Sequence, residues 1–320
     1  MRAHGLEPES LAVTETITVG GESLSPYRNL IINGDMLIWQ RGELFNPLNT
    51  SPQYAAVDRW SVERGGSGDS TISDSGSSLT EFRKSVQLAS GDSNSKNLYA
   101  WQRIEGDNFL SLIGETVYVG AWVYVSVNEN ASIYIYSNDS GTRDAWASAE
   151  NFGNTLIKQV DNDITSGVWT YISTTFTVTS ECANGVALGI RFGEIDNSVG
   201  CYITGVRMHR GSVEIPWSVL SRTPEEEMAL CQRYFQIFTY AFAAYESAGN
   251  NCVAYTNWAT DMRVAPTISG DTDAYYYAIS NVLTTGTVFI AKVEGCVAFR
   301  PAIASAHVQF SGKAKADAEL

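Results

Sequence analysis

The stretch ITGVRMHRGSVEIPWSVLSRTPEEEMALCQRYFQ, residues Ile203–Gln236, divides the chain into two parts. It begins with a strand pattern, continues through a turn-rich linker and ends with a helix start signal. Thr223 suits the N-cap position, Pro224 the first helical position, and Glu226 the third position of a capping box. We therefore predict a short linking helix over residues 224–238, which opens a second, smaller domain.

Four apolar residues of this predicted helix fall on one stripe, namely Met228, Cys231, Phe235 and Phe238. Such a stripe could pack around a threefold axis between subunits. It could equally pack against the helix's own domain. The sequence leaves both arrangements open.

The composition indicates a β-rich protein with two domains. The chain has 320 residues, of which 44% are hydrophobic and 18% charged, enough apolar residues for ordinary cores. Tyr and Trp, which favour strands, are frequent (16 and 8 residues), and so is Gly, which favours turns (27 residues). The formal net charge of −14 does not favour nucleic-acid binding, which needs excess positive charge.

The cysteines and the hydropathy pattern bear on the cellular compartment. The five Cys lack C-x-x-C spacing, so we expect free thiols, with neither a disulfide framework nor a zinc site. No stretch has the roughly 18 apolar residues of a membrane span, so no membrane insertion is expected. The N-terminus also lacks the apolar region of a signal peptide, which predicts synthesis in a cytoplasm.

Strand patterns dominate the chain before the dividing stretch of residues 203–236. Residues 65–80 are rich in Gly, Ser and Asp and are predicted as a surface loop. The predicted strands are Asn29–Met36 and Leu37–Gln40 around an Asn-Gly turn, then Tyr54–Val62, Ser85–Leu88, Leu98–Glu105, Thr116–Val127, Ser132–Ser137, Thr170–Val178, Val186–Phe192 and Cys201–Met208. Strands at this spacing without helices between them predict an antiparallel jelly-roll sandwich.

Three parts follow from this pattern. Residues 1–28 are polar and form an N-terminal arm, residues 29–216 form the jelly roll, and residues 217–320 form the helix with a small β-rich C-terminal domain. In this last part the predicted strands are Cys252–Trp258, Pro266–Ser269, Tyr275–Ser280, Val288–Val293, Gly295–Phe299 and Ala306–Ser311. The fold class is therefore mainly β.

Two predicted strands alternate aliphatic and aromatic residues. The aliphatic positions of Thr116–Val127 and Ser132–Ser137 are predicted to face the core, because side chains alternate across a strand. If the two strands are neighbours in one sheet, a single aromatic face results. Its members would be Tyr118, Trp122, Tyr124, Tyr134 and Tyr136.

An aromatic face of this kind is suited to binding a glycan, because rings stack on the C–H faces of sugars and Tyr hydroxyls bond to sugar hydroxyls. Arg143 and Trp146 in the loop 137–150 would add to its rim. The same face could instead be covered by a loop, by the N-terminal arm or by another subunit. The faces could also be reversed, with the aromatic residues in the core.

Signatures of catalysis are absent from the sequence. It has no H-E-x-x-H, G-x-S-x-G, P-loop or dinucleotide-binding motif, so we predict no catalytic residue and no cofactor. Three separated His do not predict a metal site. The acid pairs Glu194/Asp196 and Asp161/Asp163 are predicted to lie in loops and are weak candidates for glycoside hydrolysis. The sequence leaves open whether an acidic loop binds a structural calcium ion.

Several separated motifs are similar to one family of proteins. NLIINGDMLIWQRG (residues 29–42) and YAAVDRW (54–60) resemble the opening of a carbohydrate-binding-module-like domain in bacteriophage tail fibre and tail tip proteins. Residues 102–106, 112–117, 169–171 and 176–178 resemble its middle. The closest similarity lies in the dividing stretch, residues 203–236. The MRVAPT motif (262–267) and the last residues, 317–320, resemble the family's usual C-terminal module. At Met208–Arg210 the chain departs from the family's usual Leu-Glu and small residue.

The resemblance implies a non-enzymatic virion protein, made in the bacterial host cytoplasm. It would be a tail fibre or tail tip appendage, a homotrimer bound to other tail or baseplate proteins through its N-terminal arm. It would bind a host-surface polysaccharide during adsorption. A purely architectural baseplate or capsid-decoration protein is the alternative, and a polysaccharide depolymerase ranks last.

Overall fold

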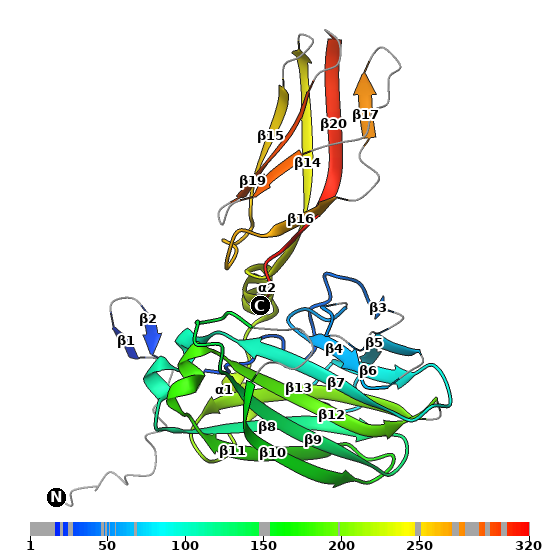
Figure 1. Cartoon of the computed structure of the whole chain (residues 1–320), viewed down its shortest axis with the longest axis vertical. Helices are drawn as coiled ribbons and strands as arrows, with labels where there is room; N and C mark the ends of the chain where they lie inside the picture. Colours follow the sequence, from blue (N-terminus) through cyan, green and yellow to red (C-terminus); the bar gives the residue numbers. More distant parts are fainter. Residues whose placement is uncertain are drawn as a thin grey trace, which may run out of the picture.

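The structure is a computed structural model of the chain. It describes residues 17–19, 22–24, 28–45, 48, 50, 52–54, 56–66, 69–146, 154–197, 199–246, 251–270, 275–278, 288–291, 295–301 and 306–319. Figure 1 shows a β-sandwich with a smaller β module standing over one end, and the linking helix between them. The predicted fold class, mainly β with an antiparallel jelly-roll sandwich, a short linking helix and a smaller β-rich C-terminal domain, is confirmed.

Two antiparallel sheets form the sandwich. In spatial order, the five-stranded sheet contains β10 (Asn154–Ile164), β9 (Glu129–Asn138), β12 (Val186–Ile195), β7 (Lys96–Ile104) and β4 (Ser61–Arg64). The six-stranded sheet contains β11 (Thr170–Thr177), β8 (Thr116–Val125), β13 (Gly200–Arg210), β6 (Lys84–Ser90), β5 (Ser70–Gly76) and β3 (Leu44–Phe45). The short 3-10 helices η2 (Gly106–Asn108), η3 (Leu110–Leu112) and η4 (Ser180–Asn184) lie in the connections.

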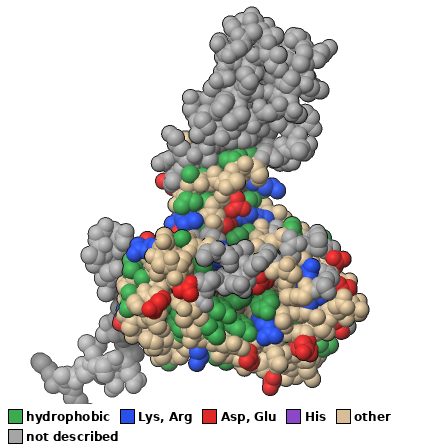
Figure 2. All heavy atoms as spheres, in the orientation of Figure 1, with side chains coloured by type: hydrophobic (Ala, Val, Ile, Leu, Met, Phe, Trp, Pro, Cys, Tyr) green, Lys and Arg blue, Asp and Glu red, His purple; other side chains and the backbone are tan. Residues whose placement is uncertain are grey.

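The core between the sheets is aliphatic. On β8, Val117, Val119, Ala121, Val123 and Val125 are at most 1% exposed, and Ile133 and Ile135 of β9 are fully buried. The prediction that the aliphatic positions of these strands face the core is therefore confirmed. The aromatic side chains of the same strands lie on the outside of the sandwich, and hydrophobic side chains remain visible on its surface (Figure 2).

The premise of a single aromatic face is wrong. Strand β8 belongs to the six-stranded sheet and β9 to the five-stranded sheet. Because the outer sides of two stacked sheets point in opposite directions, Tyr118, Trp122 and Tyr124 lie on one side of the sandwich. Tyr134 and Tyr136 lie on the other.

Residues 28–43 do not form the predicted hairpin. Asn33 adopts a left-handed backbone conformation (φ 55°), and its side chain bonds to the backbone of Ile38 and Asp58. The backbone N–H of Ile32 donates to Gln102 Oε1 (2.8 Å), and that of Asn33 donates to Glu227 Oε2 (2.8 Å). Side chains from distant segments thus satisfy this backbone in place of a strand partner.

Other differences from the sequence prediction concern strand positions. Strand β5 lies where a surface loop was predicted, and β10 was not predicted at all. Asp161 and Asp163 therefore lie on an edge strand, not in a loop, and Glu194 lies near the end of β12.

The linking region contains α1 (Trp217–Leu220) and α2 (Pro224–Gln232). The predicted capping box is present, with the Thr223 side chain and the Glu226 side chain bonding to each other's backbone N–H. Helix α2 ends at Gln232, so Phe235 and Phe238 belong to the next strand. Cys231 and Met228 pack with Ile32 and Ile38, so this part of the stripe packs on its own chain.

The C-terminal module contains two further antiparallel sheets. One is formed by β14 (Phe235–Glu246), β20 (Ala306–Asp317), β16 (Thr267–Gly270) and β17 (Tyr275–Ala278). The other is formed by β15 (Asn251–Asn257), β19 (Gly295–Pro301) and β18 (Val288–Ala291). A hairpin of β1 (Ile17–Val19) and β2 (Glu22–Leu24) falls within the predicted N-terminal arm.

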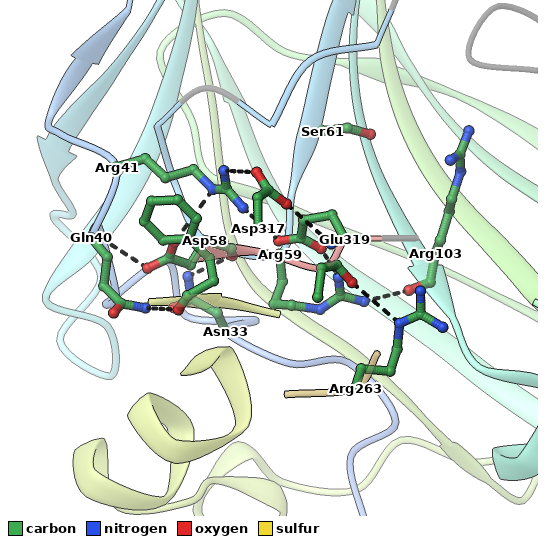
Figure 3. A network of polar contacts seen from close by, with 12 residues as sticks. Asn33, Gln40, Arg41, Asp58, Arg59, Ser61, Arg103, Arg263, Asp317 and Glu319 are labelled. Atoms are coloured by element: carbon green, nitrogen blue, oxygen red, sulfur yellow. Dashed lines mark hydrogen bonds and ion pairs between the residues drawn. The ribbon is translucent and has the colours of Figure 1, made fainter. Parts of the chain in front are cut away.

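Buried ion pairs hold the C-terminal segment against the sandwich (Figure 3). The Arg41 guanidinium pairs with Asp317 (2.7 Å) and Glu319 (3.1 Å), and Arg59 pairs with Glu319. Arg59 also lies 3.5 Å from the ring centroid of Tyr234. The side chains of Arg41, Arg59 and Glu319 are at most 7% exposed, so the two pairs with Glu319 are shielded from solvent, whereas the Asp317 side chain is 40% exposed.

Candidate functional site

An aromatic cluster lies on the outer side of the five-stranded sheet, which we call the five-stranded face. Trp101 stacks on Tyr99 (ring centroids 5.8 Å apart), and Tyr134 stacks on Tyr136 (6.2 Å). Trp101 also contacts both Tyr134 (6.2 Å) and Tyr136 (5.9 Å). The indole of Trp101 is only 4% exposed, whereas the three tyrosines are half-buried. The tyrosines are therefore the rings that a ligand would meet.

Strand register brings these rings together. Trp101 of β7 pairs with Gly189 of β12, which pairs on its other side with Tyr134 of β9. An added Cβ on Gly189 would lie 2.0 Å from the Trp101 ring. The absence of a side chain at Gly189 lets the indole lie across the central strand, where it reaches the tyrosines of β9.

A charged group sits within the aromatic cluster. Arg191 of β12 donates to the Tyr134 hydroxyl (3.1 Å) and to Asn97 Oδ1 (2.8 Å). Burial disfavours its charge, but the bond to Tyr134 and the nearby Tyr99 and Asp161 outweigh burial and raise the pKa of Arg191. The guanidinium therefore stays charged and is held in a fixed position beside the rings.

Two carboxylates border the same face. Glu63 of β4 accepts a hydrogen bond from Trp101 Nε1 (3.0 Å). Asp161 of β10 accepts from Ser132 Oγ (2.6 Å) and from Gln159 Nε2 (3.2 Å). These hydrogen bonds lower the pKa of Asp161, so its carboxylate is ionised at neutral pH and acts as an acceptor.

Two tyrosine hydroxyls on this face, those of Tyr99 and Tyr136, stay protonated. Burial raises the pKa of Tyr99 and of Tyr136 above the ordinary value. A neutral phenol both donates and accepts a hydrogen bond. The face thus offers ring surfaces, hydroxyls, a guanidinium, amides and a carboxylate within one patch.

The loop after β9 places Trp146 at one end of the face. Asn138 Nδ2 donates to the carbonyls of Ala145 (3.2 Å) and Asn184 (2.9 Å), and Asp144 Oδ1 accepts from the Gly106 N–H (2.9 Å). The Trp146 ring joins the cluster of Trp101 and Ala187, and the Arg103 guanidinium lies 5.1 Å from its centroid. Local hydrogen bonds therefore fix this rim.

Arg143 lies on the same loop but points elsewhere. It forms an ion pair with Asp107, and both side chains are about half-exposed or more (48% and 68%). An ion pair this exposed contributes little to stability. Arg143 is thus a surface residue of the rim and does not contact the aromatic cluster.

The other predicted residues belong to the outer side of the six-stranded sheet, the six-stranded face. Trp122 contacts Tyr171 (5.2 Å), and Tyr124 contacts Trp169 (5.6 Å) and Tyr202 (5.3 Å). Tyr118 is 7% exposed and stacks on His209 (5.2 Å). Burial lowers the pKa of His209, so its imidazole is neutral at pH 7. This second cluster shares no residue with the first.

Sequence reasoning missed Tyr99, Trp101 and Arg191, which form the centre of the five-stranded face. A signal was present in KNLYAWQRI (β7), where Asn97, Tyr99, Trp101 and Arg103 alternate with other residues. Alternation within one strand does not reveal which strand lies beside it. Only the pairing of β7, β12 and β9 brings these residues together.

Metal sites, reactive thiols and membrane spans bear on function as well. No group of three or more His, Cys, Asp or Glu side chains among the described residues could hold a metal ion. Cys182, Cys201 and Cys231 are buried free thiols, and Cys252 and Cys296 lie where side chains are not described. Within the part of the chain that the structure describes, no helix has the length and apolar character that a membrane crossing requires.

Comparison with known proteins gives weak similarities only. No family model matches the chain, and no curated protein matches it. A putative sugar binding protein from Bacteroides thetaiotaomicron is 14% identical, with a TM-score of 0.40, and the match covers 57% of this chain and 100% of that chain. The enzymatically active domain of bacteriophage CBA120 tailspike protein 4 is 16% identical, with a TM-score of 0.38, covering 58% of this chain and 22% of that chain.

A third similar structure is TmCBM61 in complex with beta-1,4-galactotriose. It is 10% identical, with a TM-score of 0.36, and the match covers 57% of this chain and 99% of that chain. The similar structures thus include carbohydrate-binding-module-like sandwiches and a phage tailspike domain.

Proposed function

We propose that this chain is a non-enzymatic carbohydrate-binding protein whose ligand lies on the five-stranded face. The observation that carries the proposal is Arg191, which is hydrogen-bonded to Tyr134 and Asn97 within an aromatic cluster on the outside of the sandwich. Sugars present apolar C–H faces and many hydroxyls, so their sites combine ring surfaces with a few placed polar groups. The five-stranded face has both.

Each group has a role in this proposal. Tyr99, Tyr134 and Tyr136 stack on sugar rings. Trp101 packs against these three tyrosines, and Trp146 borders one end of the five-stranded face. Arg191 and Asn97 donate hydrogen bonds to sugar hydroxyls, and Asp161 accepts them. A general acid for glycoside hydrolysis needs a raised carboxyl pKa, whereas the pKa of Asp161 is lowered. Asp161 is therefore suited to accepting hydrogen bonds and not to acting as a general acid.

The biological setting is a finer proposal that rests on the sequence resemblance. We infer that the chain is a bacteriophage tail fibre or tail tip appendage that binds a host-surface polysaccharide during adsorption. It would be made in the bacterial cytoplasm and carried on the virion, where the arm formed by residues 1–28 contacts tail or baseplate proteins. The homotrimer that the resemblance implies is a prediction, as is the absence of a cofactor.

The test is binding of the purified full chain to an array of bacterial capsular and lipopolysaccharide glycans. We expect selective binding, with Tyr134→Ala and Tyr136→Ala each weakening it about tenfold, because a lost ring contact costs about 1 kcal/mol or more. Trp122→Ala, on the opposite side of the sandwich, is the matched control and should bind as the wild type does.

The alternatives predict other outcomes. A purely architectural baseplate or decoration protein would bind no glycan on the array. A depolymerase would release reducing ends from a bound polysaccharide. Equal loss of binding in Trp122→Ala and Tyr134→Ala would contradict the assignment of the site to the five-stranded face.

A further inference from the structure

A narrow pocket lies at the end of β7, where the chain leaves the five-stranded face. Its wall includes Glu105, two residues beyond Arg103, together with Arg28 from before the sandwich and Arg233 and Tyr234 from after helix α2. The volume of the pocket is about 10 Å³, which admits a single water-sized group. Segments far apart in the sequence thus form one small recess at the end of this strand.

Arginines predominate in the wall of this pocket. Four of them line it, namely Arg28, Arg59, Arg103 and Arg233. Glu105 is the one acidic residue among the described residues of the wall, and it lies 3.6 Å from Arg233. Arg59 is neutralised by Glu319. Arg28 is exposed and forms no ion pair with any residue that the structure describes. Arg28 therefore supplies a positive charge without a counterion.

The positive charges at this pocket repel one another. Partial burial lowers the pKa of Arg28 most, and the charges of Arg222 and Arg233 lower it further. Tyr234 and Glu105 act in the opposite direction but do not offset these effects. A guanidinium nevertheless stays protonated in proteins, so the repulsion remains in the folded chain. An anion bound beside Arg28 and Arg233 would relieve it.

The pocket lies beyond one end of the aromatic cluster. The Arg103 guanidinium, two residues before Glu105, lies 5.1 Å from the ring centroid of Trp146, which borders the same end of the five-stranded face. Four residues of extended chain separate Trp101 from Glu105, which is about 13 Å. A short oligosaccharide that stacks on the tyrosines of this face is long enough to reach the pocket.

We propose that the pocket bordered by Arg28 and Arg233 binds an anionic group of the polysaccharide that lies on the five-stranded face. This inference rests on the proposed function and adds the class of ligand to it, an acidic polysaccharide with carboxylate or phosphate substituents. Guanidinium groups form charge-assisted hydrogen bonds with both kinds of group. A pocket of this size admits one oxygen of the group, while the sugar ring stays outside.

The charge of the whole chain explains why an acidic ligand needs such a pocket. A net charge of −14 repels a polyanion. On the five-stranded face itself, the carboxylates of Glu63 and Asp161 lie near the Arg191 guanidinium, so this face has no excess of positive charge. A cation without a counterion at the end of the face provides a local attraction and fixes where the acidic sugar unit binds.

Matched forms of the same polysaccharide test the ligand class. Acidic polysaccharides on the glycan array are compared with the same polysaccharides after reduction of their carboxyl groups to alcohols, and after removal of their phosphate groups. We expect the wild-type protein to bind the untreated form at least tenfold more tightly than the form that lacks the recognised charge. The treatment that weakens binding identifies the group as a carboxylate or a phosphate.

Arg28→Gln tests the pocket itself. The side chain is exposed, so the fold should persist, which circular dichroism checks. Binding of the untreated polysaccharide should weaken at least tenfold, and binding of the uncharged form should not change. Arg83→Gln is the matched control, because Arg83 is also exposed, lies between β5 and β6 of the six-stranded sheet and does not line the pocket. It removes the same charge and should bind as the wild type does.

Three results would overturn the inference and leave the proposed function standing. They are equal binding of treated and untreated polysaccharides, wild-type binding by Arg28→Gln, and equal losses in Arg28→Gln and Arg83→Gln, which would show long-range attraction and no specific pocket. In each of these cases Tyr134→Ala would still weaken glycan binding. A wild-type protein that binds no glycan on the array would overturn both proposals.

Discussion

A single glycine determines the position of the largest ring in the proposed glycan site. Trp101 lies over Gly189, and its Nε1 bonds to Glu63 on the neighbouring strand. Its indole is therefore held from two sides. The half-buried tyrosines of β7 and β9 depend on this support, because they contact Trp101 directly.

We expect Gly189→Ala to lower the free energy of unfolding by about 1–3 kcal/mol, because the new Cβ overpacks the indole. The displaced ring should also weaken glycan binding. Gly76→Ala on β5 is the control, since an added Cβ there meets nothing within 4 Å. Chemical denaturation measures both variants, and a Gly189→Ala protein as stable as Gly76→Ala would contradict this packing account.

At the scale of elements, α2 is short and depends on its start signal. Its nine residues are too few for an isolated helix to be stable. The capping box between Thr223 and Glu226 and the packing of Cys231 on Ile32 and Ile38 hold it in place. The Arg222 guanidinium adds bonds to Glu227 (2.7 Å) and to the Ile31 carbonyl (3.1 Å).

Thr223→Ala should lower the free energy of unfolding by about 1 kcal/mol, because it removes the side-chain acceptor for the Glu226 N–H. Thr165→Ala, at an exposed position outside helices and strands, is the control and should change stability by much less. Urea denaturation of the two variants gives the comparison. Equal stabilities would show that the cap does not contribute.

The same element shows where sequence reasoning succeeds and fails. The capping box predicted the start of α2 correctly, because a cap depends on residues a few positions apart. The predicted end was wrong, because Phe235 and Phe238 fit a helical stripe but begin strand β14. Their pairing with Asp317 and Ala314 of β20, about 80 residues further along the chain, decides their conformation, and no local pattern contains that information.

Strand β10 was missed for a related reason. Its sequence NTLIKQVDNDI has no apolar alternation, because it is an edge strand with most side chains exposed or half-exposed. In contrast, the alternation of β8 was correctly predicted to face the core. The candidate site was only half predictable. Tyr134 and Tyr136 were predicted from the alternation within one strand. The order of strands in the two sheets decides which aromatic residues share a face, and one strand's sequence does not contain that order.

At the scale of the whole molecule, buried charges join the sandwich to the C-terminal module. The Asp58 carboxylate is 1% exposed, accepts the Gln40 N–H (2.9 Å) and lies 3.7 Å from Arg41 Nε. Burial raises the pKa of Asp58 to about 7, although the Gln40 bond and the Arg41 charge act against it. The folded chain therefore binds a proton that the unfolded chain, with an Asp pKa of about 4, has released.

This pKa predicts how stability depends on pH. Because the folded state holds the proton more tightly, the contribution of Asp58 is fully present below about pH 4 and is lost as pH rises to about 7. The free energy of unfolding should fall over this window, by at most about 4 kcal/mol from this group. Asp58→Asn keeps an acceptor for the Gln40 N–H but cannot titrate. Its free energy of unfolding should therefore change less than that of the wild type between about pH 4 and about pH 7. An unchanged slope in this variant would contradict the assignment.

The most direct measurement compares the affinities of Tyr134→Ala, Tyr134→Phe and Trp122→Ala for a short oligosaccharide of the glycan identified on the array. A short ligand occupies one site and excludes avidity. We predict that Tyr134→Ala binds about tenfold more weakly, that Tyr134→Phe loses less because the ring remains, and that Trp122→Ala matches the wild type. Unchanged affinity in Tyr134→Ala, with the fold intact, would contradict a glycan site on the five-stranded face.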